Sequence, residues 1–267
     1  MPIDYHIHTK MCGHAAGEME EYVAVAKEKG LQEIGFSDHI PMYFLPEAER
    51  DLTIAMAEEE LPLYVERVKE VQQKFYPYPV KFGIEADFIP GMEKELASIL
   101  NKYDFDYILG SIHFLNGWGF DNSRYKAEYD KWEIYELYQL YFSTLGQAAA
   151  SGLFDTMAHP DLIKKFGFKP PGDINGLYEE TLKQVADSGV CIEVNTAGLR
   201  VPVGEIYPSV RFLELCYRFR VPVSLGSDAH KPDLVGCNLR EALELLKSVG
   251  YSQVATFSGR HRKFCRI

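Results

Sequence analysis

Histidine is the residue type whose spacing suggests chemistry in this sequence. His6, His8 and His14 fall within nine consecutive positions near the start of the chain. His6 and His8 form an H-x-H pair, and because side chains alternate between the two faces of a β-strand, both imidazoles point to the same side. Two imidazoles on one face can ligate one metal ion. A single H-x-H pair is weak evidence, since most histidines are ordinary core or surface residues.

Imidazole and carboxylate side chains recur later, at or just beyond the ends of short apolar runs. With the first three histidines they make nine candidate metal ligands: His6, His8, His14, His39, Glu85, His113, His159, Asp228 and His230. A zinc ion takes four protein ligands at most, and a catalytic zinc keeps one position open, so the set implies two or three ions with one bridging carboxylate. A set rich in imidazole suits zinc, iron or manganese better than magnesium or calcium. The remaining histidine, His261, lies in a basic segment and is expected to be exposed.

The elements that must position these residues are short β-branched or aromatic runs that alternate with helical patterns. Between the first two runs, apolar residues recur with helical spacing at Met19, Tyr22, Val23 and Ala26, and Gly30 follows as a stop. This alternation predicts repeated βα units around a parallel sheet. Strands are expected near 3–7, 33–37, 80–86, 106–112, 154–158, 190–195, 221–226 and 253–257.

Seven or eight βα units close more readily into a barrel than into an open sheet, and 267 residues is a usual length for one α/β barrel. We therefore expect a single domain that covers residues 1–267. A barrel collects its functional residues at the C-terminal ends of its strands, which is where seven of the eight histidines fall. Two long connections, at about 40–55 and 114–130, exceed ordinary βα loops and are expected to cover the site.

The composition restricts the partners and the location. A formal net charge of -11 argues against a nucleic-acid partner, because proteins that bind nucleic acid usually carry a basic surface. No apolar run approaches the roughly 20 residues of a membrane helix, and a polar strand stands where a secretory signal would need an apolar segment. Five widely spaced cysteines without a C-x-x-C pair fit reduced thiols, so a cytoplasmic location is expected. Cys12 lies near His14, and we expect a buried thiol there rather than a ligand.

The order and wording of the ligand motifs resemble the polymerase and histidinol phosphatase (PHP) family. That family has an H-x-H followed by a further His, a T/S-D-H after the second strand, a Glu, two single His residues and a C-terminal D-x-H. The loops resemble its monofunctional histidinol-phosphatases in particular. The matching segments run from residue 6 to about 236 and read "FSDHIPM", "GIEADFIPG", "FDYILGSIHFL", "HPDLIKKFG", "EVNTAGLR" and "LGSDAHKP".

The resemblance implies a distorted, TIM-like (β/α)7 barrel, with the eighth expected strand outside the closed sheet, and a trinuclear metal centre. Asp38 stands beside His39 and could replace it as a ligand, or could instead orient a neighbouring histidine. The implied ligands are His6, His8, Glu85 and Asp228 for the first ion, Glu85, His113 and His159 for the second, and His14, His39 and His230 for the third.

The activity implied by the resemblance is hydrolysis of L-histidinol phosphate to L-histidinol and phosphate in histidine biosynthesis. We hypothesise that a hydroxide shared by two metal ions attacks the phosphorus in line, with Glu85 as the bridging carboxylate. Asp228, His230 or a metal-bound water would protonate the leaving group. Arg200 is the first candidate for the phosphate ligand, because a guanidinium presents two parallel donors, and Lys164 is the second.

Three alternatives stay open. A metal-dependent amidohydrolase also begins its barrel with H-x-H, but many binuclear members carry a modified lysine at the end of strand four, where this sequence has His113. The substrate could instead be another small phosphomonoester or a nucleotide. Finally, a non-catalytic barrel could bind metal alone, although the complete ligand set argues against this.

Overall fold

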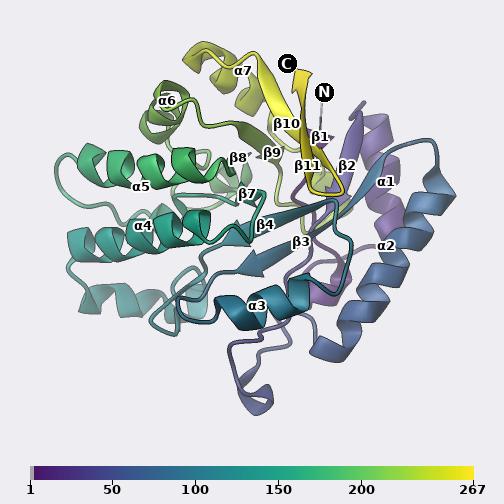
Figure 1. Cartoon of the computed structure of the whole chain (residues 1–267), viewed down its shortest axis with the longest axis horizontal. Coiled ribbons are helices and arrows are strands. Elements are labelled where there is room, and N and C mark those ends of the chain that lie inside the picture. The colour runs from purple at the N-terminus through teal and green to yellow at the C-terminus, as the bar shows by residue number, and fades with distance from the viewer. Residues whose placement is uncertain (1–2) are drawn as a thin grey trace.

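Seven parallel strands form the centre of the protein, and each corresponds to one of the first seven expected runs. The computed structural model describes residues 3–267 (Figure 1). The strands lie in the order β1-β2-β3-β4-β7-β8-β9. Their bounds are Ile3–Asp4 (β1), Glu33–Phe36 (β2), Val80–Asp87 (β3), Tyr107–Ser111 (β4), Thr156–Met157 (β7), Cys191–Asn195 (β8) and Val223–Gly226 (β9).

The first and last strands of this sheet meet and close it into a distorted barrel. Ile7 and Ala229 form a parallel bridge, and the backbone N–H of His8 donates to the carbonyl of Ala229 at 2.9 Å. The Tyr5 N–H likewise donates to the Leu225 carbonyl at 3.0 Å. The expected TIM-like barrel of seven β/α units is therefore confirmed.

Seven α-helices form a ring around the strands in the described part of the chain (Figure 1). The first of them has Met19, Tyr22, Val23 and Ala26 as its buried residues, so the predicted apolar spacing is the face that packs on the barrel. The helices are Met19–Glu28 (α1), Leu61–Phe75 (α2), Glu93–Leu100 (α3), Ile134–Ala150 (α4), Asn175–Ser188 (α5), Val210–Arg218 (α6) and Leu239–Val249 (α7). None of the helices within residues 3–267 has the length and apolar character that a membrane span requires.

An aromatic layer fills the barrel next to the site. The rings of Tyr5 and Tyr107 stack with their centroids 4.7 Å apart, and Phe257 lies 6.2 Å from Tyr5. A β-carbon at Gly35 or Gly83 would collide with the Tyr107 ring, so these two strand positions require glycine. The layer leaves the carboxyl ends of the strands as the open end of the barrel.

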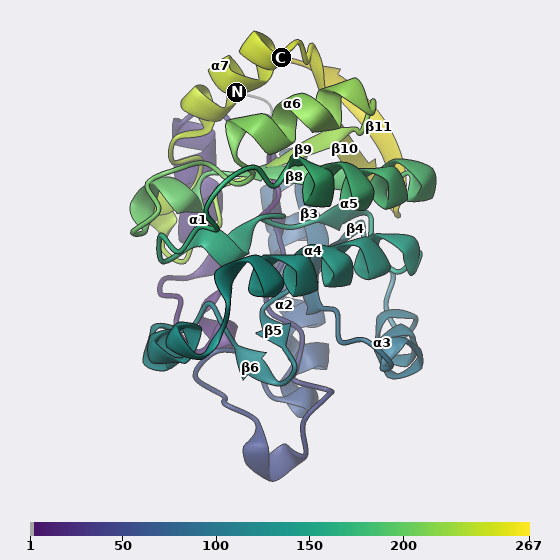
Figure 2. The same ribbon diagram turned by 90° about the vertical axis from the view of Figure 1, so that its left-hand side faces the viewer.

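The eighth expected strand lies outside the barrel sheet, as the resemblance implied. It is β10 (Gln253–Ser258), which pairs antiparallel with β11 (His261–Arg266) in a hairpin, and His261 is exposed there. The long connection after β4 contains a second hairpin, β5 (Phe114–Leu115) and β6 (Trp118–Gly119), and Figure 2 shows it at the same end of the molecule as the connection between β2 and α2.

Candidate metal centre

One carboxylate, that of Glu85 on β3, lies at the centre of the predicted ligands. Its Oε2 lies 3.3 Å from Nε2 of His6 and 3.4 Å from Nε2 of His8. The same oxygen lies 2.9 Å from Nδ1 of His39. Glu85, His6 and His8 are almost completely buried, so these contacts form in an interior from which water is largely excluded.

The other oxygen of Glu85 faces a different group. Oε1 lies 2.9 Å from Nε2 of His159 and 3.6 Å from Nε2 of His113, and it accepts a hydrogen bond of 2.5 Å from the Ser111 hydroxyl. Each oxygen of one carboxylate therefore meets its own set of imidazoles. This is the arrangement that a carboxylate bridging two metal ions requires.

Asp228 follows β9, which lies beside β1, and completes the first group. Its Oδ1 lies 3.3 Å from Nε2 of His8 and 3.8 Å from Nε2 of His6. Asp228 and His159 both adopt left-handed backbone conformations, with φ of +55° and +28°. Non-glycine residues adopt this region at a cost in free energy, and such strain is concentrated at functional sites.

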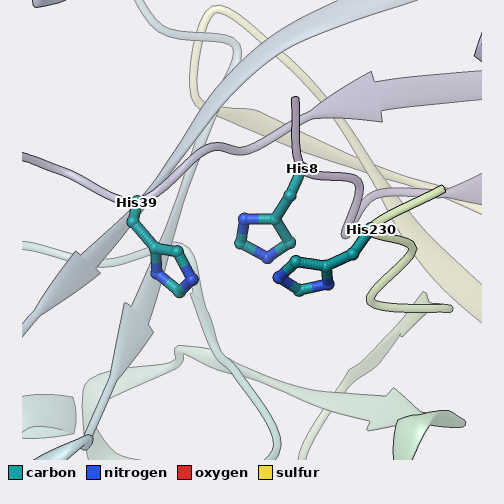
Figure 3. Close-up of side chains that lie close together, drawn as sticks. All are labelled: His8, His39 and His230. Atoms are coloured by element: carbon teal, nitrogen blue, oxygen red, sulfur yellow. The ribbon is translucent and has the colours of Figure 1, made fainter. Parts of the chain in front are cut away.

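The third group lies at the mouth of the barrel. The rings of His8, His39 and His230 converge in Figure 3, and one nitrogen from each lies within 4.8 Å of the others. The His14 ring stands 4.5 Å from that of His230 and 5.5 Å from that of His39. The three histidines expected at the third ion are thus brought together, and His8 lies between this group and the first.

The buried atoms at the centre fit metal ligation. Within residues 3–267, Nε2 of His6, Nε2 of His8 and Oε2 of Glu85 have no hydrogen-bond partner. Leaving buried polar atoms unpaired costs about 1 to 3 kcal/mol each. A divalent cation among them would satisfy all three, and imidazole nitrogen with carboxylate oxygen is a donor set that zinc, iron and manganese accept.

The outer nitrogens of several histidines are held by acceptors. Glu193 Oε1 lies 2.8 Å from Nδ1 of His6, and Asp87 Oδ1 lies 2.9 Å from Nδ1 of His113. Backbone carbonyls play this part for two others: that of Cys12 at 3.0 Å for His14, and that of Asp228 at 3.2 Å for His230. Such partners fix the ring orientation and leave Nε2 free for a metal ion.

Two of these acceptors, Glu193 and Asp87, were not predicted from the sequence. Asp87 stands two residues after Glu85 on β3, so both side chains point to the same side of the sheet. Glu193 and Asn195 have the same relationship on β8. The period of two from the predicted ligand Glu85 is the signal that could have identified Asp87, whereas no predicted ligand on β8 points to Glu193.

Asp38 and Cys12 lie beside the centre rather than in its middle. The Asp38 carboxylate accepts hydrogen bonds from the Thr9 hydroxyl and, at 3.2 Å, from the His39 N–H, and lies 3.5 Å from Nδ1 of His8. These contacts favour the orienting role for Asp38 and leave His39 facing Glu85. Burial and the nearby Asp38 raise the pKa of the Cys12 thiol, so it stays protonated at neutral pH and is a poor ligand in that form.

The two central carboxylates are ionised in the metal-free protein. Burial favours the neutral acid at Glu85, but the charges of His6 and His39 outweigh it and hold the pKa well below its usual range. At Asp228, burial is likewise outweighed, by His6 and His8, and the pKa again lies well below normal. The centre therefore keeps fixed negative charge in its middle, which attracts cations.

Two adjoining cavities open over the centre. One, of about 260 Å³, is lined by the histidine groups together with Arg200 and Tyr207. The other, of about 460 Å³, extends beneath the two long connections, which therefore cover the site as expected. Asp121 and Lys165 line both cavities and mark the boundary between them.

Arg200, the first candidate for the phosphate ligand, lies on the wall of the smaller cavity. Its Nη2 donates to the Ser227 carbonyl and its Nη1 to the Thr196 carbonyl at 3.3 Å. The guanidinium is thus fixed to the backbone that leads into Asp228. Its remaining N–H groups are available to a molecule in the cavity.

The structure does not bring the second candidate, Lys164, to either cavity wall. Its ammonium is buried, 2.9 Å from Asp161 and 3.2 Å from Glu205, and this corrects the expectation from the sequence. The next residue, Lys165, takes the predicted place, with Nζ 3.0 Å from Oδ2 of Asp121. Adjacent residues of a short helical turn point in different directions, and the sequence "KK" alone does not show which one faces the site.

Comparison with known proteins gives a consistent result. The model of the PHP domain family matches residues 4–197. A probable histidinol-phosphatase of Deinococcus radiodurans is 41% identical over 261 residues, which cover 97% of both chains. The histidinol-phosphatase of Bacillus subtilis is 28% identical, with 90% of this chain and 98% of that protein covered.

A solved structure shares the fold. The crystal structure of histidinol phosphate phosphatase from Lactococcus lactis, in complex with zinc, L-histidinol and phosphate, superposes with a TM-score of 0.83. The two proteins are 21% identical, and 98% of each chain is covered. At that identity the likeness supports the architecture of the barrel.

Proposed function

Because this chain belongs to the PHP family and, within it, to the histidinol-phosphatases, we propose that it hydrolyses L-histidinol phosphate to L-histidinol and phosphate with divalent metal ions. The observation that carries the proposal is the Glu85 carboxylate, whose two oxygens face two separate groups of buried imidazoles. A site for several cations at the open end of a barrel is suited to bind a phosphate dianion.

We assign two or three ions of zinc, iron or manganese to this centre. When bound, such ions polarise the phosphoryl group and increase the acidity of water. The ligand assignment follows the three groups described above, with His8 close to both the first and the third. It comprises His6, His8, Glu85 and Asp228; Glu85, His113 and His159; and His14, His39 and His230.

Asp228 is our candidate for the proton carrier. Its pKa lies well below the usual range, so the carboxylate is ionised and can accept a proton from the attacking water. Passing that proton to the leaving alcohol oxygen, as the new P–O bond forms and the ester P–O bond breaks, balances the reaction. His230 is the alternative; burial and His8 hold its pKa well below normal, so it too is unprotonated at rest.

Lys165 and Arg200 are the candidates for the phosphate ligands. Both reach the cavity over the histidines, and both present N–H donors with positive charge. Asp121 is the candidate for the ammonium of the substrate, because its carboxylate borders the larger cavity. Met42 and Phe114 provide apolar surface there for the imidazole ring.

The domain organisation, the partner and the location are proposed from packing, charge and the state of the cysteines. We propose that residues 1–267 act as one domain, because the C-terminal hairpin packs on the barrel through Phe257. Neither cavity is lined by a row of basic residues, so the partner is a small phosphate ester rather than nucleic acid. The five cysteines carry free thiols, which fits a cytoplasmic location.

The decisive experiment measures phosphate released from a panel of monoesters that includes histidinol phosphate, other small phosphate esters and nucleotides. We expect the highest kcat/KM for histidinol phosphate. A clear preference for another ester would change the substrate, and amide or ester hydrolysis without phosphate release would replace the proposal by an amidohydrolase. Chelation should abolish turnover, and zinc, iron or manganese should restore it; full activity of the stripped enzyme would exclude the metal-dependent mechanism.

A further inference from the structure

We propose that Glu193 is the positioning residue that couples the first two groups of ligands, an inference that rests on the proposed metal centre. Glu193 lies on β8 and is completely buried, and it belongs to neither group itself. One of its oxygens holds a side chain of the first group, and the other holds the backbone of the second.

The first contact fixes the tautomer of His6. Glu193 Oε1 lies 2.8 Å from Nδ1 of His6. With Nδ1 donating to this carboxylate, Nε2 is the nitrogen of the neutral imidazole that can ligate a metal ion. Nε2 lies 3.3 Å from Glu85 Oε2, where the first ion is assigned.

The second contact supports the strained backbone of His159. Glu193 Oε2 accepts the main-chain N–H of His159 at 2.9 Å. His159 has φ of +28°, a conformation that persists only where neighbouring groups hold it. The same residue directs Nε2 to Glu85 Oε1 at 2.9 Å, in the second group.

The hydrogen-bond partners of Glu193 are donors to its carboxylate. Besides His6 and the His159 backbone, Asn195 Nδ2 donates to Oε2 at 3.0 Å. A glutamine of the same size keeps one acceptor oxygen, so its amide N–H groups would face the donors on one of the two sides. Gly226 lies against the contact between Glu193 and His6, because a β-carbon at this position would collide with both Glu193 Oε1 and His6.

The consequence is specific. Loss of the acceptor at position 193 should lower the affinity for the two ions that share Glu85. The affinity for the ion of the third group, with His14, His39 and His230, should not change. Removing the partner of a ligating histidine costs about 10- to 100-fold in metal affinity. If Glu193 had a purely structural role, its loss would instead lower the stability of the fold and reduce the affinity for all ions alike.

The test measures zinc bound per chain at graded free zinc concentrations for the wild type, Glu193→Gln and a control, Asp155→Asn. Asp155 is a largely buried carboxylate that accepts from the Ile108 N–H at 2.8 Å and contacts no histidine of the centre. We expect E193Q to need about 10- to 100-fold more zinc for two ions while one ion binds as in the wild type. We expect D155N to bind zinc like the wild type.

Wild-type zinc binding by E193Q, or an equal loss at all ions, would overturn the inference. A wild type that binds none of zinc, iron and manganese would instead overturn the proposed function, so the two failures are distinguishable. If circular dichroism shows that E193Q does not fold, Glu193→Asp takes its place. Its shorter carboxylate cannot reach both partners, and unchanged affinity for every ion would again overturn the inference.

Discussion

Lys165 Nζ lies 3.0 Å from Oδ2 of Asp121, at the boundary between the two cavities. The positive charge of Lys165 matches a phosphate, and the negative charge of Asp121 matches an ammonium. A substrate such as histidinol phosphate carries both of these groups, on neighbouring carbons. In the free protein each side chain neutralises the other. A substrate that binds across the boundary would exchange this ion pair for two new ones.

Replacing Lys165 with alanine should lower kcat/KM for histidinol phosphate by about 10- to 100-fold, because a hydrogen bond to a charged group contributes roughly 1.5 to 3 kcal/mol. Steady-state kinetics of phosphate release measures the effect. Lys169→Ala is the control, since Lys169 is exposed and pairs with Glu205 away from the cavities. Equal kinetics of K165A and K169A would remove Lys165 from the site.

Replacing Asp121 with asparagine should affect substrates with an ammonium and spare those without one. We expect kcat/KM for histidinol phosphate to fall by about 10- to 100-fold, the value of one charged hydrogen bond, while that for 4-nitrophenyl phosphate changes little. The ratio of the two constants is the measurement. A parallel decrease for both esters would show that Asp121 acts on Lys165 or the metal centre instead.

Arg200→Ala should raise KM for a phosphate ester much more than Arg200→Lys, because lysine keeps a positive charge beside the phosphate. KM from initial rates distinguishes the two variants. If both raise KM equally, Arg200 acts by holding the Ser227 carbonyl in place rather than by its charge.

Removal of His14 and removal of His8 should have different effects on metal content. The His14 ring lies nearest to those of His230 and His39, in the third group, so His14→Ala should lose one ion per chain. His8 lies between the first and third groups, 3.4 Å from Glu85 and with its ring 4.2 Å from that of His230, so His8→Ala should lose more and should be less active. Elemental analysis of the purified variants checks this; equal metal loss would contradict the grouping.

The metal-free protein should become less stable as the pH rises from 6.5 to 10. Burial lowers the pKa of His8 and His113, but nearby carboxylates outweigh it and raise these values to about 9 and about 10, above the unfolded value of 6.5. The folded protein therefore binds more protons, and this stabilisation is complete below pH 6.5 and lost as the pH passes 9 to 10. Thermal unfolding of chelator-treated protein measures the effect. A melting temperature that increases over this range would contradict it.

Strand positions and the identity of the first ligands could be predicted because they follow local rules. The alternation along β1 gives His6 and His8 one face, and the barrel rule places His159 and Asp228 at the strand ends. Which side chains complete the site could not be predicted, because that depends on contacts between distant strands. Glu193 meets His6 across 187 positions of the chain, and Lys165 rather than Lys164 faces the cavity because of a local turn.

The pairing between β1 and β9 also determines when the cation site can form during synthesis. His6 and His8 leave the ribosome first, but the backbone of Ala229 that they pair with, and the neighbouring Asp228, come some 220 residues later. At about 5 to 20 residues per second, this interval lasts roughly 10 to 45 s. The nascent chain therefore carries the H-x-H pair without Asp228 throughout that time, and the full cation site exists only once the barrel has closed.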